Sequence, residues 1–277
     1  MPKLLSEAEV ESYRRDGYYF PLRAMPAGEA LSYRQRLESY ERQTGAPIHS
    51  NYRHKVHLLF TWANELVHHP RILDAVEDVL GPNLLCWTTN FFIKEAHTQD
   101  FVSWHQDSTY WGLNSDEVVT AWVAFTDAPV ESGAMKFWAG SHRMEQIDHR
   151  DTFDDHNLLS RGQEITVAVP ADEGVLVPLK AGEFSLHHVK LVHGSEPNTT
   201  GDRRIGLAIR YIPTHVRQLK TEDSAMLVRG RDAYGNFDPE PQPEGDLDED
   251  ALAAHQDAVQ RQVAALYSGT QRQEFRR

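Results

Sequence analysis

A series of short apolar segments, separated by turn residues, occupies the middle of the chain and limits the fold most. The runs are "LLCWTTNFFIKEA", "VVTAWVAFTDA", "GAMKFWAGSH", "EITVAVP", "GVLVPLKAGEFSLHH" and "RIGLAIRYIP", all rich in Val, Ile, Phe and Trp, with Gly, Pro and Asn between them. Short strands at such spacing are typical of an all-β sandwich or barrel. We therefore predict a mainly β core over about residues 84–215.

Helical patterns precede this core. Ser6 can cap a first helix, with Glu9 completing a capping box. The following "DGYYF" ends that helix and enters a strand. Two further helices are predicted, over about residues 27–44 and 64–80, each closed by a glycine, and Pro70 lies near the start of the main part of the second.

Another helix is predicted at the C-terminal end. Residues 235–250 are acidic and proline-rich, which indicates a linker or loop. The apolar residues of the next segment fall on one helical stripe, made of Leu252, Val259, Val263 and Leu266. We expect a single domain over residues 1–277, with a helical part (1–83), the β core (84–215) and this C-terminal loop and helix (235–277).

The composition limits the classes of binding partner and the compartment that suit this chain. The net charge of −13 argues against nucleic acid and anionic membranes. The single cysteine, Cys86, excludes an intrachain disulfide, fits a reducing compartment and is predicted to be buried. No apolar stretch has the length of a signal peptide or a membrane span. We expect a cytoplasmic monomer or homodimer that acts on a small molecule.

The tripeptide His-Gln-Asp occurs at residues 105–107 and again at 255–257. Side chains two residues apart share a face of a strand but diverge by about 200° on a helix. The second copy lies in the predicted C-terminal helix and therefore cannot bind one ion. The first copy lies in the β-rich region, where His105 and Asp107 would point the same way. A further pair, His149 and Asp151, lies in a polar stretch that we expect to be a surface loop.

His193 ends an apolar strand of the same core, and Arg204 lies eleven residues later on the next strand. Two histidines and one carboxylate form the facial triad of non-haem Fe(II) oxygenases, which leaves three open positions on the metal. A 2-oxo acid can fill two of these and O₂ the third. The far carboxylate of such a cosubstrate needs a fixed cation, and a guanidinium matches it through two hydrogen bonds.

These motifs together resemble the phytanoyl-CoA dioxygenase family. They are His105-Gln-Asp107, the run "TAWVAFTDAPVESGAMKFWAGSHR", His193-Gly-Ser195 and Arg204, and the similarity extends from "LSEAEVESYRRDGYYF" to about "YIP". The family is a branch of the Fe(II)/2-oxoglutarate oxygenases that also contains ectoine hydroxylase and the syringomycin-type halogenases. The resemblance implies a double-stranded β-helix (a cupin-like jelly roll) with helices packed outside, and Fe(II), 2-oxoglutarate and O₂ as cofactor and cosubstrates.

The resemblance also implies roles for individual residues. His105, Asp107 and His193 match the iron ligands of the family. The residues that match cosubstrate contacts are Arg204, Ser195, Trp122, Asn90 and Lys55. In the halogenases a small residue replaces the carboxylate ligand, and the presence of Asp107 implies that chloride has no site here.

Other conspicuous residues are expected to be structural. Arg203 should face away from Arg204 into solvent, Arg210 should form a structural salt bridge, and His187 should be a core or rim histidine. Surface placement is expected for His54, His57, His68 and His69. Core packing is expected for Trp104, Tyr110 and Trp111, and a turn position for His142.

The sequence therefore predicts a hydroxylase of a small metabolite or natural-product intermediate, polar or amine-bearing, that releases succinate and CO₂. The acidic chain makes a polyanionic acyl-CoA a less attractive substrate, although acyl-CoA hydroxylation remains an alternative. A cupin-like isomerase or metal-binding module would also use a metal in a β barrel, but would not need Arg204. An inactive family member would be expected to have lost a ligand.

Overall fold

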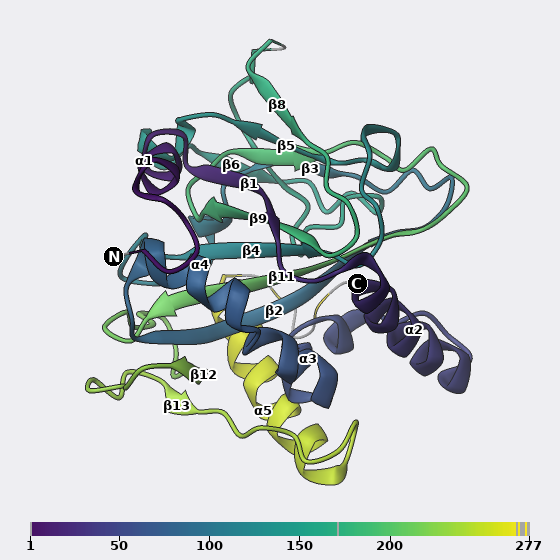
Figure 1. The fold of residues 1–277 in the computed structure, drawn as a ribbon, viewed down its shortest axis with the longest axis vertical. Helices are drawn as coiled ribbons and strands as arrows, with labels where there is room; N and C mark the ends of the chain where they lie inside the picture. Colours follow the sequence, from purple (N-terminus) through teal and green to yellow (C-terminus); the bar gives the residue numbers. More distant parts are fainter. Residues whose placement is uncertain (1, 171, 270, 272–274, 276–277) are drawn as a thin grey trace.

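Two sheets face each other in the computed structural model, which describes residues 2–170, 172–269, 271 and 275 (Figure 1). Within these residues the larger sheet has the strand order β1-β9-β4-β11-β2-β12-β13, and the smaller one β3-β10-β5-β8. A separate pair, β6 and β7, lies beside β3. The strands are β1 (Tyr18–Arg23), β2 (Leu84–Lys94), β3 (Val102–His105), β4 (Val119–Ala124), β5 (Met135–Trp138), β6 (His149–Asp151), β7 (Gln163–Ile165), β8 (Gly174–Val177), β9 (Glu183–His188), β10 (His193–Ser195), β11 (Arg204–Pro213), β12 (Ser224–Arg229) and β13 (Asp238–Pro239).

The predicted helices are present. They are α1 (Glu7–Asp16), α2 (Ala27–Thr44), α3 (Thr61–Val67), α4 (Pro70–Leu80) and α5 (Glu249–Leu266). The capping box of α1 forms as expected, with Ser6 and Glu9 each bonded to the other's backbone N–H. The helix predicted over 64–80 is instead two helices, because Pro70 has no N–H to continue α3 and starts a new helix at its first position.

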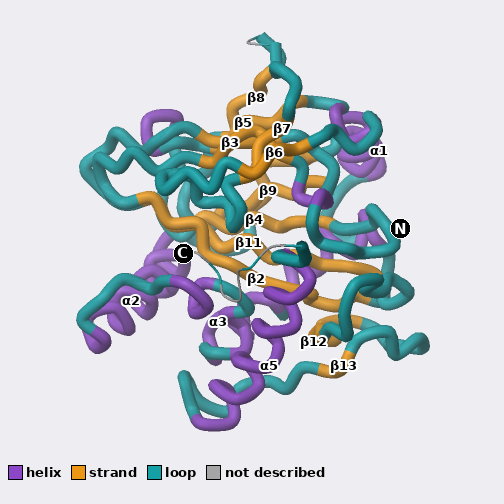
Figure 2. The backbone as a smooth tube through the Cα atoms, turned by 180° about the vertical axis from the view of Figure 1, so that it is seen from behind, coloured by secondary structure: helices purple, strands orange, loops and turns teal. Residues whose placement is uncertain are grey.

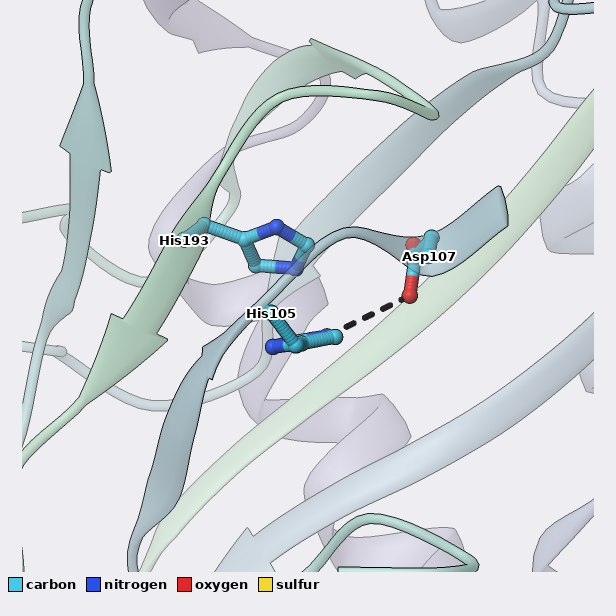
Figure 3. A group of neighbouring side chains, drawn as sticks. All are labelled: His105, Asp107 and His193. Atoms are coloured by element: carbon cyan, nitrogen blue, oxygen red, sulfur yellow. Dashed lines mark ion pairs between the residues drawn. The ribbon is translucent and has the colours of Figure 1, made fainter. Parts of the chain in front are cut away.

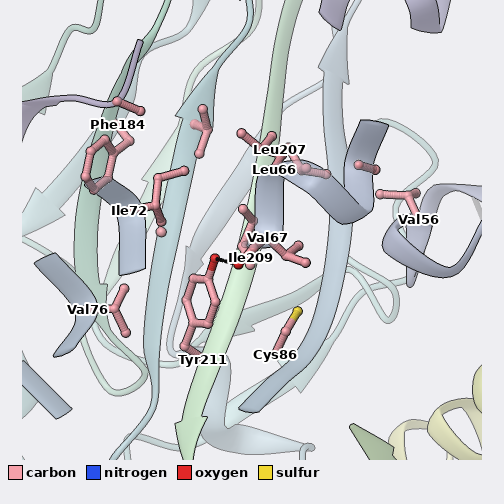
Figure 4. Close-up of a cluster of buried hydrophobic side chains, with 14 of the residues drawn as sticks. Val56, Leu66, Val67, Ile72, Val76, Cys86, Phe184, Leu207, Ile209 and Tyr211 are labelled. Atoms are coloured by element: carbon pink, nitrogen blue, oxygen red, sulfur yellow. Dashed lines mark hydrogen bonds between the residues drawn. The ribbon is translucent and has the colours of Figure 1, made fainter. Parts of the chain in front are cut away.

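Strand parity gives the larger sheet two different faces. On β11 the side chains of Ile205, Leu207 and Ile209 belong to the core cluster that α3 and α4 cover. Figure 4 shows this cluster, with Leu66, Ile72 and Val76 of the helices against Phe184, Leu207 and Ile209 of the sheet. The alternate residues of β11 point to the other face, toward the smaller sheet.

The space between the two sheets forms a second core. Phe137 of the smaller sheet packs there with Trp122 and Ala208 of the larger one. Figure 2 shows the smaller sheet from behind, above the larger one. Two facing, largely antiparallel sheets with helices outside confirm the predicted jelly roll.

Two segments differ, in part or wholly, from their predictions. Residues 235–250 are mostly loop, as expected, but they are not a free linker, because Asp238–Pro239 pairs with β12 and Glu240 is buried. His149–Asp151 is not a loop but strand β6, paired with β7. β12 was not predicted at all. Among the residues that the structure describes, none of the helices has the length and apolar character needed to cross a bilayer.

Candidate active site

The first His-Gln-Asp copy and His193 meet between the two sheets. His105 on β3 and His193 on β10 are direct partners across an antiparallel ladder, with ring centroids 4.1 Å apart. Asp107 begins a single 3₁₀ turn after β3, and its Oδ1 lies 3.4 Å from His105 Nε2 (Figure 3). One potential ligand atom from each residue lies within 4.8 Å of the other two, and all three residues are buried.

The two histidine rings are held in one orientation. Nδ1 of His105 lies 2.9 Å from the carbonyl oxygen of Ser103, and Nδ1 of His193 lies 2.9 Å from that of Leu191. Each Nδ1–H therefore donates to the backbone, and each Nε2 lone pair is directed to the centre of the group. Within the described part of the chain, His105 Nε2 and Asp107 Oδ2 have no hydrogen-bond partner. Since unpartnered buried polar atoms are costly, this donor set fits a cation, and two histidines with one carboxylate fit Fe(II).

The protonation states also suit a metal. Burial by itself would raise the pKa of Asp107, but Arg210 and the two histidines more than offset this and lower it. Burial and the neighbouring His105 lower the pKa of His193 to about 4. At neutral pH these two groups are therefore already deprotonated, as metal binding requires.

Gln106, between the two ligand candidates, secures the turn. Its side chain points away from the centre, where Nε2 donates to the carbonyl oxygen of Lys190 at 2.9 Å. Its backbone N–H donates to His149 Nε2 at 2.9 Å. Asp151 accepts from the hydroxyl of Tyr110 at 2.7 Å. His149 and Asp151 thus brace the segment that carries His105 and Asp107, a role that sequence reasoning missed because the contacts span about forty residues.

A cavity beside the two histidines brings together three of the predicted cosubstrate residues. Trp122, Ser195 and Arg204 line it with His105 and His193. Arg204 is 2% exposed, lies 5.1 Å from the Trp122 ring and donates one hydrogen bond, from Nη1 to the carbonyl oxygen of Gly133 at 2.8 Å. Its Nε has no hydrogen-bond partner among the described residues. Burial lowers the pKa of Arg204 to about 10, so the guanidinium stays charged at neutral pH.

Lys94 lies behind this cavity and was not identified from the sequence. It pairs with Arg204 across the β2–β11 ladder and is fully buried. Its Nζ donates to Ser195 Oγ at 2.6 Å and to the carbonyl oxygen of Glu196. Burial and Arg204 lower the pKa of Lys94 to about 6. Because Ser195 accepts from Lys94, its own hydroxyl proton is free to be donated.

A second cavity opens on the other side of the metal candidates. It is lined by Asp107, Asn90, Trp111 and Arg210, with α5 contributing Gln262 and Leu266. Asn90, expected to contact the cosubstrate, accepts a hydrogen bond from Arg210 here. Arg210 was expected in a structural salt bridge. Instead it lines both cavities, with Nη2 3.9 Å from Asp107 Oδ2.

Lys55, which was expected to contact the cosubstrate, lies in neither of the two cavities. Its Nζ donates to the carbonyl oxygens of Trp87 and Ser224, both at 2.9 Å, and to the carboxylate of Glu240 at 2.5 Å. His57 contacts the other oxygen of Glu240 at 2.8 Å. Lys55 therefore belongs to a buried ion cluster at the edge of β2 that anchors the C-terminal segment.

The second His-Gln-Asp copy behaves as predicted. His255 is buried in α5 with Nε2 2.9 Å from the carbonyl oxygen of His54. Asp257 points outward, where its 61% exposed carboxylate pairs with Arg261. Their side chains diverge, as the helical period requires.

Several expectations for single residues need correction. Arg203 does face away from Arg204, but it is paired with Glu41 and Glu95 and only 13% exposed. None of the four histidines expected at the surface is fully exposed, since His57 is buried and the others are partly buried: His54, His68 and His69. As expected, His187 is a core histidine, against His193, and His142 holds a turn against α1. Trp104 and Tyr110 pack outside both cavities, whereas Trp111 lines the second.

Comparison with known proteins gives consistent results. Residues 1–206 match the family described as "Phytanoyl-CoA dioxygenase (PhyH)". A solved structure titled "non-heme monooxygenase; ThoJ apo" superposes with a TM-score of 0.84 at 38% identity, covering 93% of this chain and 96% of that one.

Two curated proteins are also similar. The "Probable alpha-ketoglutarate-dependent hypophosphite dioxygenase" of Stutzerimonas stutzeri is 31% identical over 157 residues, which is 56% of this chain and 54% of that protein, so the match spans about half its length. The "L-proline trans-4-hydroxylase" of Streptomyces griseoviridis is 24% identical over 75% of this chain and 86% of that protein. Since the family match covers well over half of the residues, the chain belongs to the phytanoyl-CoA dioxygenase family, whose members are Fe(II)- and 2-oxoglutarate-dependent dioxygenases.

Proposed function

We propose that His105, Asp107 and His193 bind Fe(II) and that the chain hydroxylates a small molecule. The observation that carries this proposal is the convergence of three buried potential ligand groups, two of which, His105 and Asp107, have a buried atom without a hydrogen-bond partner among the described residues. When bound, Fe(II) with 2-oxoglutarate and O₂ supplies the oxidation of an unactivated C–H bond, with release of succinate and CO₂.

Arg204 binds the distal carboxylate of 2-oxoglutarate in this proposal. Arg204 lines a cavity that the two histidines also line, and its guanidinium carbon lies 5.1 Å from the centre of the Trp122 ring. Its Nε has no hydrogen-bond partner among the described residues. Ser195 adds a hydroxyl proton, because Lys94 occupies its acceptor side. An isomerase or a simple metal-binding module has no use for a buried cation at this place, which favours the oxygenase.

The substrate enters the second cavity, beside Asp107. Most of the residues that line it are aromatic, aliphatic or neutral polar, so a small polar molecule fits better than a polyanionic CoA thioester. The two curated relatives carry hypophosphite and L-proline in their names, both small molecules. Asp107 fills the position that a halide would need, so hydroxylation is favoured over halogenation.

The test compares the two His-Gln-Asp copies. His193→Ala should lose stoichiometric Fe(II) and all succinate release, whereas His255→Ala should keep Fe(II), because His255 Nε2 contacts the backbone carbonyl of His54 and is not part of the triad. Metal content is measured first, and succinate release is then followed across a panel of metabolites. Retention of Fe(II) by His193→Ala would refute the proposed metal centre.

A further inference from the structure

Arg210 is a buried cation that the proposed chemistry does not use. It is 6% exposed, lies on the same face of β11 as Arg204, and lines both cavities. Its guanidinium lies 5.1 Å from the ring of Trp111 and 5.9 Å from that of Phe92. The two rings lie against the guanidinium, which borders the cavity next to Asp107 as well as the cavity that Arg204 lines.

The contacts of Arg210 do not satisfy it. One nitrogen donates to the side-chain oxygen of Asn90, Nη2 lies 3.9 Å from Asp107 Oδ2, and Nε has no hydrogen-bond partner among the residues that the structure describes. A separation of 3.9 Å is too long for a hydrogen bond. Asp107 is also the only carboxylate among the described residues that line the two cavities. A desolvated guanidinium with free N–H groups needs an acceptor from outside the chain.

The charges of the loaded site lead to the same conclusion. Doubly charged Fe(II) with the carboxylate of Asp107 would leave one positive charge, and the 2-oxoglutarate dianion with Arg204 would leave one negative charge. These two cancel. The charge of Arg210 then remains in a buried site, and a singly charged anion would neutralise it.

We infer that the substrate carries a carboxylate, or an equivalent monoanionic group, and that Arg210 binds it. This inference rests on the proposed function and names the substrate class of the same site. An ammonium group in this cavity would meet Arg210 and be repelled, so of the polar and amine-bearing substrates that the sequence suggested, Arg210 favours an acidic one. Asn90, bonded to the guanidinium, fixes the direction in which Arg210 presents its remaining N–H groups.

The experiment uses acetate as the probe and acetamide as its neutral isostere. Ligand-detected NMR measures both against protein loaded with Zn(II), which does not turn over, and saturating 2-oxoglutarate, which occupies Arg204. Acetate should bind at least about tenfold more tightly than acetamide, as expected for a hydrogen bond to a charged group. Arg210→Gln should remove that preference, Arg210→Lys should keep part of it, and Arg217→Gln, at an exposed arginine, should leave it unchanged.

Each other result overturns the inference. Equal binding of acetate and acetamide by the unaltered protein, or no binding of acetate, would show that Arg210 does not recognise an anion. If Arg210→Gln lost its metal, the role of Arg210 would be to hold Asp107 in place as a metal ligand. If Arg210→Gln bound 2-oxoglutarate more weakly, its role would be to bind the cosubstrate. Since metal and 2-oxoglutarate binding by the unaltered protein are measured beforehand, their absence would refute the proposed function separately.

A substrate panel then extends the test. Each carboxylic acid is assayed beside its primary amide, and the acids should stimulate succinate release while the amides should not. In Arg210→Gln this acid-over-amide preference should disappear. A panel in which the amides alone stimulate turnover would contradict the assignment.

Discussion

Replacing Arg204 with alanine should weaken 2-oxoglutarate binding without removing the metal. The guanidinium is desolvated, since it is 2% exposed, and among the described residues it donates a hydrogen bond only to the carbonyl oxygen of Gly133. Truncating one partner of such a charge pair costs about 2–5 kcal/mol. At about 1.4 kcal/mol per decade, the dissociation constant of 2-oxoglutarate should rise at least roughly thirtyfold.

The neighbouring arginine is the matched control. Arg203→Ala removes the same group from the opposite face, where it pairs with Glu41 and Glu95, so 2-oxoglutarate binding should change by less than about threefold. Arg204→Lys should restore only part of the 2-oxoglutarate affinity, because an ammonium cannot form the two parallel hydrogen bonds of a guanidinium and would lie beside Lys94.

The measurement is a titration of each metal-loaded variant with 2-oxoglutarate, followed by succinate release against 2-oxoglutarate concentration. Metal content of Arg204→Ala should equal that of the unaltered protein, because Arg204 supplies no ligand atom to the triad. Equal losses at residues 203 and 204, or no loss at 204, would refute the assignment of the cosubstrate cavity.

Three further changes probe the surroundings of the site. Gly206→Ala would place a Cβ 1.8 Å from the ring of Trp122, so denaturant titration should show a loss of about 1–3 kcal/mol and 2-oxoglutarate should bind more weakly; unchanged values would contradict the close contact. Lys94→Met should raise the 2-oxoglutarate dissociation constant about tenfold by freeing Ser195, measured by the same titration, and an unaltered constant would rule that contact out. Glu240→Gln should lower the free energy of unfolding by about 3–5 kcal/mol. Since the pKa of Glu240 is about 2 in the folded protein against 4.5 normally, that difference should be full above pH 4.5 and shrink as the pH falls toward 2; a pH-independent difference would exclude the ion pair as its cause.

Features that depend on neighbours along the chain could be predicted. The capping box of α1, the β core and the stripe of α5 all follow from local periodicity, and the structure has each of them. The same periodicity separated the two His-Gln-Asp copies, because a strand aligns residues two apart and a helix separates them. His105 and Asp107 could therefore be paired from the sequence before any fold was known.

The opposite directions of Arg203 and Arg204 also followed from parity, since adjacent residues on a strand point to opposite faces. Parity does not say what lies opposite a side chain. Arg203 was expected in solvent, yet α2 covers that face and supplies Glu41. The direction of the side chain was local, whereas its environment depended on a helix that lies far away in the sequence.

Residues whose partners are distant in sequence were misplaced or missed. Lys55 was predicted to contact the cosubstrate, but its partner Glu240 lies 185 residues later, in a segment whose composition predicts a linker or loop. The burial of Lys94 and Arg210 could not be predicted from the sequence, because the charged end of a lysine or arginine side chain on a strand ordinarily reaches solvent. The two side chains are buried beside the triad because the smaller sheet, the loops and α5 pack over the larger sheet. Burial depends on which surfaces meet in space, and no local sequence pattern encodes that.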